Sequence, residues 1–407
     1  MDPTIVKAAM LNLGSRAVVI ESSYARQLAL CLGGLLVLRL AGLYFAETDL
    51  GFDEAQYWSW SRALDFGYFS KPPMIAWLIR GASAICGDGE ACIRAASPVL
   101  YTLASLMLYL AGRSLYGERI GFWSAIVFAT LPGVSFSSNL ITTDVPLILF
   151  WTIMLYAWVM LVKRRSTGYA VLLGMAIGLG LLAKQAMIYA VLCIACHAAV
   201  SHDAREALKG GRSVVAAAVA LALFSPNLIW NAEHGFPTAR HTAANIGWQF
   251  PYVHPLQLGE FVGAQLGVFG PILFVVLLRG AWRVLRVPSD GNKLLLLSLS
   301  LPVLVLLAVQ AMLSRAHGNW AATAYPAASI FVTMTMLELN RLMLFRISLA
   351  LHLLVAVVLA AAPAFARQLP IFEQLKFMSA VVGWREASEA VRAKLDAERY
   401  GSILVDS

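Results

Sequence analysis

Residues 144–162 read DVPLILFWTIMLYAWVMLV, an almost uninterrupted apolar run with Asp144 as its single charged residue. An α-helix rises about 1.5 Å per residue, so a run of this length can cross a hydrocarbon core roughly 30 Å thick. Lys163, Arg164 and Arg165 follow at once, and basic residues at the end of a span mark its cytoplasmic side. This stretch therefore predicts a transmembrane helix that begins with Asp144 at the outer face.

The rest of the chain has the same character. Of its 407 residues 59% are hydrophobic and 13% are charged, whereas soluble domains carry about 25% charged residues. A water-soluble fold of this length has no room to hide so much apolar surface, so the solvent must be lipid. We predict an all-α polytopic membrane protein with about eleven transmembrane helices. The predicted spans are 27–46, 95–112, 120–138, 144–162, 168–183, 186–200, 213–230, 261–279, 294–313, 321–340 and 346–366.

The distribution of basic residues sets the orientation. Most loop lysines and arginines fall inside if the N-terminus is cytoplasmic and the spans alternate, and the net charge of +8 reflects this bias. We therefore expect no nucleic-acid partner. No cleavage site follows the first apolar run, which we interpret as an uncleaved first span. The tail after residue 367 then lies outside and carries an amphipathic stretch over 384–399.

Two outer loops are long and rich in aromatic residues. Loop 47–94 predicts two amphipathic helices, 53–64 and 73–86, separated by Lys71-Pro72-Pro73. Loop 231–260 holds scattered Trp, His and Pro residues. Cys86 and Cys92 lie in the first of these loops, so they have the opportunity to form a disulfide in an oxidising compartment.

The first loop contains the two motifs that suggest chemistry most directly. Asp53 and Glu54 are adjacent carboxylates beside aromatic rings, where a carboxylate can serve as a general base, but both also suit the N-terminus of a helix. Lys71 stands before paired prolines that hold its backbone. Its ammonium group suits a phosphate at headgroup level, and the alternative is a lysine that reaches lipid headgroups.

Four more motifs stand at outer ends of spans. Asp144 is either a helix cap or a second acid on the face of Asp53. Lys184 follows an apolar run and should line a cavity or pair with an acid, because lysine is costly in lipid. The last two motifs, Trp230 to Pro237 and Arg315 to Trp320, contain His234 and His317, which are more often structural than catalytic.

Metal binding and haem attachment are both disfavoured by the sequence. Glu233, His234, His241 and His317 carry metal-binding groups, but their spacing is not diagnostic, so we predict neither a metal nor another cofactor. Cys193-Ile194-Ala195-Cys196-His197 matches a haem-attachment string but lies inside a predicted span, so we interpret it as packing residues. All six chemical motifs share the outer face, in a topology that was derived without them.

Asp53-Glu54 with Tyr57-Trp58, followed by Gly67-Tyr68-Phe69-Ser70-Lys71-Pro72-Pro73, resembles the first outer loop of one family. That family comprises the bacterial protein-mannosyltransferase-like and aminoarabinose-transferase-like glycosyltransferases, which have the GT-C fold and modify lipid A. Further segments resemble it in the same order, from about residue 50 to 400. They are Thr143-Asp144-Val145-Pro146, Leu182-Ala183-Lys184, Pro226 to Asn231 with His234-Gly235, Gly318-Asn319-Trp320 and Gly383-Trp384-Arg385-Glu386.

The resemblance implies an inverting transfer of a sugar from a polyprenyl phosphate. The acceptor would be a glycolipid such as lipopolysaccharide or lipid A, a polysaccharide or a protein. It also implies a bacterial inner membrane location with a periplasmic active site. We expect a GT-C catalytic domain over 1–366 and a short periplasmic tail over 367–407. The alternative is a membrane transporter or lipid flippase, although no internal repeat of the transporter kind is visible.

The resemblance also implies residue roles. Asp53 would be the catalytic base and Asp144 a second acid needed for activity. Gln56 stands where the aminoarabinose transferases have an arginine, and Ser70-Lys71 stands where many relatives have Asp-His, so this chain departs from the family pattern at both places. The resemblance implies donor phosphate binding for Lys71 and Tyr68, and we expect Lys184 and Arg240 to support them as further cations. Substrate binding is expected for Glu54, Gln56, Tyr57, His234, Asn319 and Trp320.

Overall fold

The computed structural model of the protein describes residues 3–247, 253–287, 290–368 and 381–398. These residues are largely helical and contain no strand, which confirms the prediction of an all-α protein. The first half of the chain forms α1 (Pro3–Tyr44), α2 (Phe52–Ser61), α3 (Met74–Cys86), α4 (Glu90–Tyr116), α5 (Glu118–Thr130), α6 (Pro132–Ser137), α7 (Asp144–Arg164), α8 (Thr167–Ala183), the 3₁₀ helix η1 (Gln185–Ile188) and α9 (Tyr189–Val200). The second half forms α10 (His202–Leu208), α11 (Arg212–Glu233), α12 (Pro237–Ile246), α13 (Pro255–Phe269), α14 (Pro271–Arg286), α15 (Gly291–Ser298), α16 (Leu301–Leu313), η2 (Gly318–Ala324), α17 (Tyr325–Glu338), α18 (Leu342–Ala361), η3 (Ala362–Phe365) and α21 (Trp384–Glu398).

Six helices in the described part of the chain are long and apolar enough to cross a membrane, and seven if the bent pair α13–α14 is one span. The predicted number of about eleven is therefore not confirmed. Several predicted spans correspond to shorter or broken helices. For example, α8 has 17 residues, and the run over 120–138 divides into α5 and α6 at Pro132, because proline cannot continue the hydrogen bonding of a helix. The six segments are Tyr24–Tyr44, Glu90–Tyr116, Asp144–Arg164, Arg212–Glu233, Gly291–Leu313 and Leu342–Phe365.

The span predicted over 261–279 is not one straight helix. The chain bends by 111° between α13 and α14. Gly270 at the bend has a φ of +89°, and a Cβ atom added there would lie 2.2 Å from the imidazole of His352. Pro271 then starts α14, where the missing N–H of proline is harmless. Apolar composition alone does not reveal this bend, because both helices are apolar.

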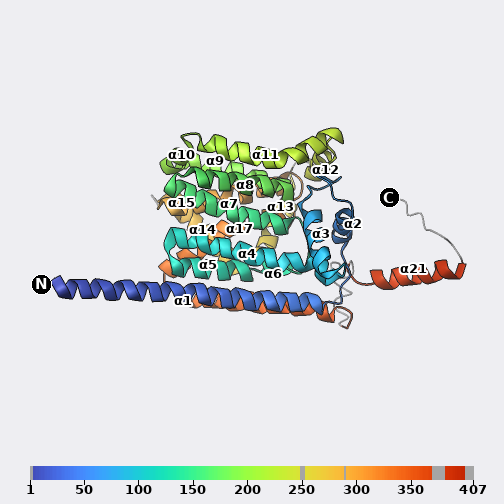
Figure 1. Cartoon of the computed structure of the whole chain (residues 1–407), viewed down its shortest axis with the longest axis horizontal. Coiled ribbons are helices and arrows are strands. Elements are labelled where there is room, and N and C mark those ends of the chain that lie inside the picture. The colour runs from blue at the N-terminus through green and yellow to red at the C-terminus, as the bar shows by residue number, and fades with distance from the viewer. Residues whose placement is uncertain (1–2, 248–252, 288–289, 369–380, 399–407) are drawn as a thin grey trace.

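The long helices pack side by side, with α1 along one edge and α11 along the opposite edge (Figure 1). Helix α7 lies in the interior, where Trp151, Met154 and Trp158 are fully buried. A helix that is apolar on all sides can lie in lipid or inside the protein, and the burial of these three side chains shows that α7 lies inside. His197 of α9 is also buried, and its Nδ1 accepts a hydrogen bond from Trp158 Nε1 at 3.1 Å. The packing role expected for this motif is thus confirmed for Cys193, Ile194 and His197, which are buried, whereas Ala195 is exposed.

Helices α2, α3 and α12 gather at the end of the bundle opposite the N-terminus, and α21 projects beyond them (Figure 1). The two helices expected in the loop 47–94 are confirmed as α2 and α3. A disulfide joins Cys86, at the end of α3, to Cys92, in the first turn of α4. The predicted tail helix is confirmed as α21, although its expected last residue, 399, lies outside the described residues.

Candidate active site

Four charged side chains from separate segments meet at the end of the bundle that holds α2, α3 and α12. Asp53 lies in the first turn of α2, Lys71 in the loop before α3, Asp144 at the start of α7 and Lys184 directly after α8. The charges of Lys184, Asp53 and Asp144 all act on Lys71. The structure therefore brings together the two acids and two lysines that the sequence singled out.

Asp144 is held by two partners and is almost buried. Its Oδ1 accepts a hydrogen bond from Lys184 Nζ at 2.7 Å, and its Oδ2 accepts one from Asn319 Nδ2 at 2.9 Å. The expectation that Lys184 pairs with an acid is thus confirmed. Both carboxylate oxygens of Asp144 are engaged, so this residue orients a cation and an amide and is poorly placed to accept a proton.

Asp53 has the opposite environment. Its side chain is exposed, and it forms no ion pair with any of the described residues. The hydroxyl of Tyr57, one turn further along α2, hydrogen-bonds to it. Burial and the negative charge of Asp53 raise the pKa of Tyr57, so the phenol stays protonated and remains a donor. Asp53 is therefore an open carboxylate beside the lysines.

Glu54 is anchored in the interior by Arg94 of α4. Arg94 Nε donates to Glu54 Oε1 at 3.0 Å and Arg94 Nη2 to Oε2 at 2.6 Å. The two carboxylate oxygens also accept the backbone N–H groups of Ile141 and Gly51, each at 2.9 Å. Every strong acceptor position of Glu54 is occupied, and this argues against the substrate contact expected from the sequence.

Arg94 is a residue of this site that sequence reasoning missed. Besides Glu54 it binds the backbone carbonyl oxygens of Thr48 and Asp49, at 3.2 and 2.7 Å. Its side chain is 2% exposed. The sequence did contain a signal for this ion pair. Arg94 stands at the start of a predicted span, where a buried charge requires a partner, and the outer loop before it contains the acids Asp53 and Glu54.

The loop that carries Lys71 is fixed by its own aromatic residues and by α11. The ring of Tyr68 stacks on Trp60 with centroids 4.8 Å apart. Its hydroxyl lies 3.1 Å from the Trp60 carbonyl oxygen and accepts the Asp65 N–H. A Cβ on Gly67 would lie 2.2 Å from the ring of Trp230, so only glycine allows this approach. The Tyr68 hydroxyl is thus engaged with backbone, which weakens the expectation that it binds a phosphate.

Helix α12 connects the two lysine-bearing segments. Thr238 Oγ1 donates to the Tyr68 carbonyl oxygen at 3.0 Å, and Thr242 Oγ1 lies 2.6 Å from Gln185 Oε1, next to Lys184. Between them, the ring of His241 packs edge-on against Phe69. Burial and Lys71 lower the pKa of His241, while Asp53 opposes the shift. The sequence suggested His241 only as a metal ligand, whereas the structure places it beside Lys71 and Asp53.

The remaining predicted residues lie around this centre. Arg240 of α12 is exposed and forms no ion pair within the described chain. His234 stacks on Trp230 at 4.2 Å, and its Nδ1 lies 2.7 Å from the Trp230 carbonyl oxygen, so its contacts are structural. Gln56 is half-buried in α2, and Trp320 packs against His317.

A metal-binding cluster is absent from the described residues. Among them, no three His, Cys, Asp or Glu side chains lie close enough together to hold an ion. Glu233, His234, His241 and His317 therefore do not form a common set of ligands.

We expect the protonation of Lys71 to determine how activity, measured as kcat/KM, falls at alkaline pH. Burial and the positive charge of Lys184 lower the pKa of Lys71, while Asp53 and Asp144 oppose the shift. The cation is lost as the pH rises through this pKa, so kcat/KM should fall at a lower pH than an ordinary lysine would give. Lys71→Arg should move this fall to higher pH, because a guanidinium stays protonated. Lys209→Arg, at an exposed lysine paired with Glu206, is the control. If Lys71→Arg left the alkaline fall in kcat/KM at the same pH, Lys71 would not be the cation that activity requires.

Comparison with known proteins places this chain in a family. Residues 70–230 match the family described as dolichyl-phosphate-mannose-protein mannosyltransferase. The lipid A galacturonosyltransferase RgtD of Rhizobium johnstonii is 36% identical over 92% of this chain and 79% of its own length. The undecaprenyl phosphate-alpha-4-amino-4-deoxy-L-arabinose arabinosyl transferase of Pseudomonas savastanoi pv. phaseolicola is 29% identical over 41% of this chain and 33% of its own.

Two solved structures share the fold. The undecaprenyl phosphate-bound ArnT of Cupriavidus metallidurans has a TM-score of 0.62 and 18% identity, covering 84% of this chain and 66% of its own. The Archaeoglobus fulgidus oligosaccharyltransferase has a TM-score of 0.53 and 16% identity, covering 83% of this chain and 55% of its own. The fold is therefore GT-C. The 36% identity with RgtD over most of both chains shows in addition that the protein is a membrane glycosyltransferase. More particularly, the chain belongs to the lipid A-modifying family of GT-C glycosyltransferases. The transporter alternative is set aside on this evidence.

Proposed function

We propose that the protein moves a galacturonosyl residue from a polyprenyl-phosphate donor to lipid A or a related glycolipid, with inversion at the anomeric carbon. The observation that carries the proposal is the contrast between two acids: Asp53 is open beside the lysines, whereas Asp144 is locked by Lys184 and Asn319. The sugar and acceptor are suggested by the name of the galacturonosyltransferase that is 36% identical over most of this chain. The carrier lipid is suggested by the undecaprenyl phosphate bound to ArnT.

The proposed reaction needs a base and a cation. The acceptor oxygen attacks the anomeric carbon from the face opposite the phosphate, and Asp53 takes the acceptor's proton. The bond from the anomeric carbon to the phosphate oxygen breaks, and polyprenyl phosphate leaves with the electron pair. Lys71 stabilises the charge that develops on the leaving phosphate, because none of the described residues forms an ion pair with it. At about 4 Å and an effective dielectric near 20, such a pair contributes about 4 kcal/mol.

Lys184 and Arg240 support Lys71 in this scheme. The charge of Lys184 is partly balanced by Asp144, so its proposed task is to complete the field around the phosphate. Arg240 is exposed on α12 and precedes His241, whose ring packs against Phe69 of the Lys71 loop, so we propose that it is available to a substrate group. Asn319 acts through Asp144, whose Oδ2 it binds.

We place the site on the periplasmic side of a bacterial inner membrane, with a cytoplasmic N-terminus. The disulfide between Cys86 and Cys92 supports this placement, because disulfides form in oxidising compartments. The distribution of basic residues supports the same orientation. We also propose that residues 1–366 form the catalytic domain and that 367–407 form a periplasmic tail, of which 369–380 and 399–407 lie outside the described residues.

A donor panel tests the proposal. The purified protein is incubated with lipid A and one of three lipids: polyprenyl-phosphate galacturonate, polyprenyl-phosphate aminoarabinose, or polyprenyl phosphate without a sugar. We expect a gain in lipid A mass equal to one galacturonosyl residue with the first donor alone. Transfer of aminoarabinose in its place would overturn the proposed sugar. A lack of transfer with every donor and with other glycolipid acceptors would overturn the proposed substrates.

A further inference from the structure

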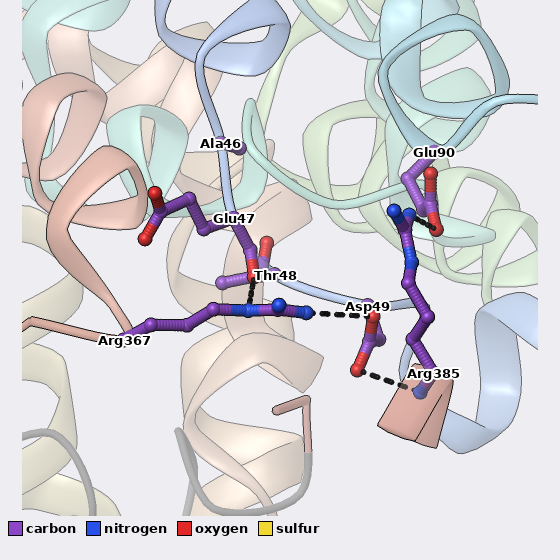
Figure 2. Close-up of a pocket in the computed structure, with 7 residues that line it drawn as sticks. All are labelled: Ala46, Glu47, Thr48, Asp49, Glu90, Arg367 and Arg385. Carbon is purple, nitrogen blue, oxygen red and sulfur yellow. Dashed lines mark hydrogen bonds and ion pairs between the residues drawn. The ribbon is translucent and has the colours of Figure 1, made fainter. Parts of the chain in front are cut away.

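The sequence motif Gly383-Trp384-Arg385-Glu386 has no part in the reaction described above, yet it lies against the segment that leads to Asp53. Figure 2 shows Arg385 and Arg367, from the C-terminal part of the chain, flanking Glu47, Thr48 and Asp49. Segment 45–51 connects α1 to α2, and Asp53 is the second residue of α2. The motif thus contacts the connection that determines where α2 starts.

Asp49 is the main anchor of this contact. Its N–H donates to the carbonyl oxygen of Val381 at 2.8 Å. Its Oδ2 accepts the N–H group of Trp384 at 2.9 Å and that of Arg385 at 3.4 Å, the second of which is drawn in Figure 2. These donors belong to the first turn of α21, so a carboxylate from the outer loop binds the positive end of that helix. Gly383, with a φ of +96°, makes the turn that directs them to Asp49.

Ion pairs extend the contact on both sides. Arg385 pairs with Glu90 at the start of α4, at 2.9 Å. Arg367 pairs with Glu386 at 2.7 Å, and its Nε donates to the carbonyl oxygen of Glu47 at 3.2 Å (Figure 2 shows the latter bond). The C-terminal residues therefore bind the outer loop, α4 and each other.

The same connection is held from the interior by Arg94, which binds the carbonyl oxygens of Thr48 and Asp49. Asp49 therefore has its carbonyl group on the α4 side and its N–H and carboxylate on the side of the C-terminal turn. Asp49 is 5% exposed, so water does not replace these bonds. The backbone is fixed between two groups of ligands four residues before Asp53.

We propose that the turn Gly383 to Glu386 is a positioning element of the active site, which sets the start of α2, and with it Asp53, by binding Asp49. This inference rests on the proposed role of Asp53 as base. The contacts given above join the C-terminal turn to segment 47–49, to α4 and to Arg367, and none of them involves Lys71 or Lys184. Loss of the turn should therefore affect the chemical step and leave donor binding intact. A displacement of about 1 Å at a reacting group can cost about a hundredfold in rate.

The test replaces Asp49 in the full-length protein. Asp49→Ala removes the acceptor of two N–H groups, and we expect kcat to fall by about ten- to a hundredfold while KM for the polyprenyl-phosphate donor stays within about twofold. Asp49→Asn keeps an oxygen in the same place and should restore most of kcat. Asp290→Ala is the matched control, because Asp290 likewise accepts a backbone N–H, that of Asn292, at the start of α15. It should leave kcat unchanged.

A second variant avoids the buried position. Arg385→Glu alone and Glu90→Arg alone each break the exposed ion pair of these two residues and should lower kcat. The double variant, with both substitutions, restores the pair with its charges exchanged and should recover the lost kcat. Wild-type kcat in Asp49→Ala would overturn the inference, and so would a parallel rise in the donor KM or a loss of folded protein. Asp53→Asn is measured alongside, because full activity there would overturn the proposed base instead.

Discussion

Asp53→Asn should lower kcat by about a thousandfold, because general-base catalysis contributes about 10²- to 10⁴-fold and asparagine cannot take a proton. The substitution is nearly isosteric, and Asp53 is exposed, so the fold should not change. The amide oxygen can still accept the hydrogen bond from Tyr57. The donor KM should stay near that of the wild type, since Lys71 and Lys184, which we propose as phosphate ligands, are untouched. Single-turnover transfer of a labelled sugar to lipid A measures the chemical step directly.

Asp88→Asn is the matched control for Asp53→Asn. Asp88 is an exposed aspartate of the same outer loop. It pairs with Arg62 and accepts a hydrogen bond from Trp58 Nε1, and it forms no ion pair with Lys71 or Lys184. Its replacement should leave kcat unchanged. Equal transfer by Asp53→Asn and the wild type would remove Asp53 as the base and direct attention to the remaining acids near Lys71.

Arg94→Leu should destabilise the protein by about 3–5 kcal/mol and abolish transfer, because it leaves the buried carboxylate of Glu54 without its cation. The same change releases the carbonyl oxygens of Thr48 and Asp49 and so frees the segment before Asp53. The free energy of unfolding, measured in detergent with denaturant, reports the first effect. The transfer assay reports the second.

Two further variants separate charge from packing in this prediction. Adding Glu54→Gln to Arg94→Leu should recover part of the stability, because no buried charge remains unpaired while the amide oxygen still accepts the Ile141 N–H. Arg62→Leu is the control, since the pair of Arg62 and Asp88 is solvent-exposed and exposed pairs contribute less than about 1 kcal/mol. If Arg94→Leu were as stable as Arg62→Leu, the buried pair would have no structural importance.

The charged residues of the site were predictable because each is costly in its local context. A lysine after an apolar run, such as Lys184, needs an acid, and the structure supplies Asp144. The opposite roles of the neighbours Asp53 and Glu54 were not predictable. Successive residues on a helix point in different directions, and only the packing against α4 shows that Glu54 faces the interior.

The long spans were predictable as well, whereas their breaks were harder to locate. Hydropathy identifies apolar residues, and it predicted α4, α7, α11 and the apolar segment Tyr24–Tyr44 of α1 well. It does not report direction, so the bend at Gly270 appeared as part of a continuous span. The dipeptide Gly270-Pro271 was the local signal, and the contact of Gly270 with His352 shows how tightly the bend is packed.

The sequence by itself determined the class of solvent and the motifs, and its basic loops predict the orientation, because apolar runs, basic loops and proline or glycine positions act locally along the chain. The tertiary structure alone decided which charges are paired and which are open. Arg94, His241 and Asp49 acquire their places through contacts between segments far apart in sequence: Arg94 with Glu54, His241 with Phe69, and Asp49 with Trp384. The strength of such polar contacts depends on burial and on distances of a few ångströms, and these exist only once the helices have packed.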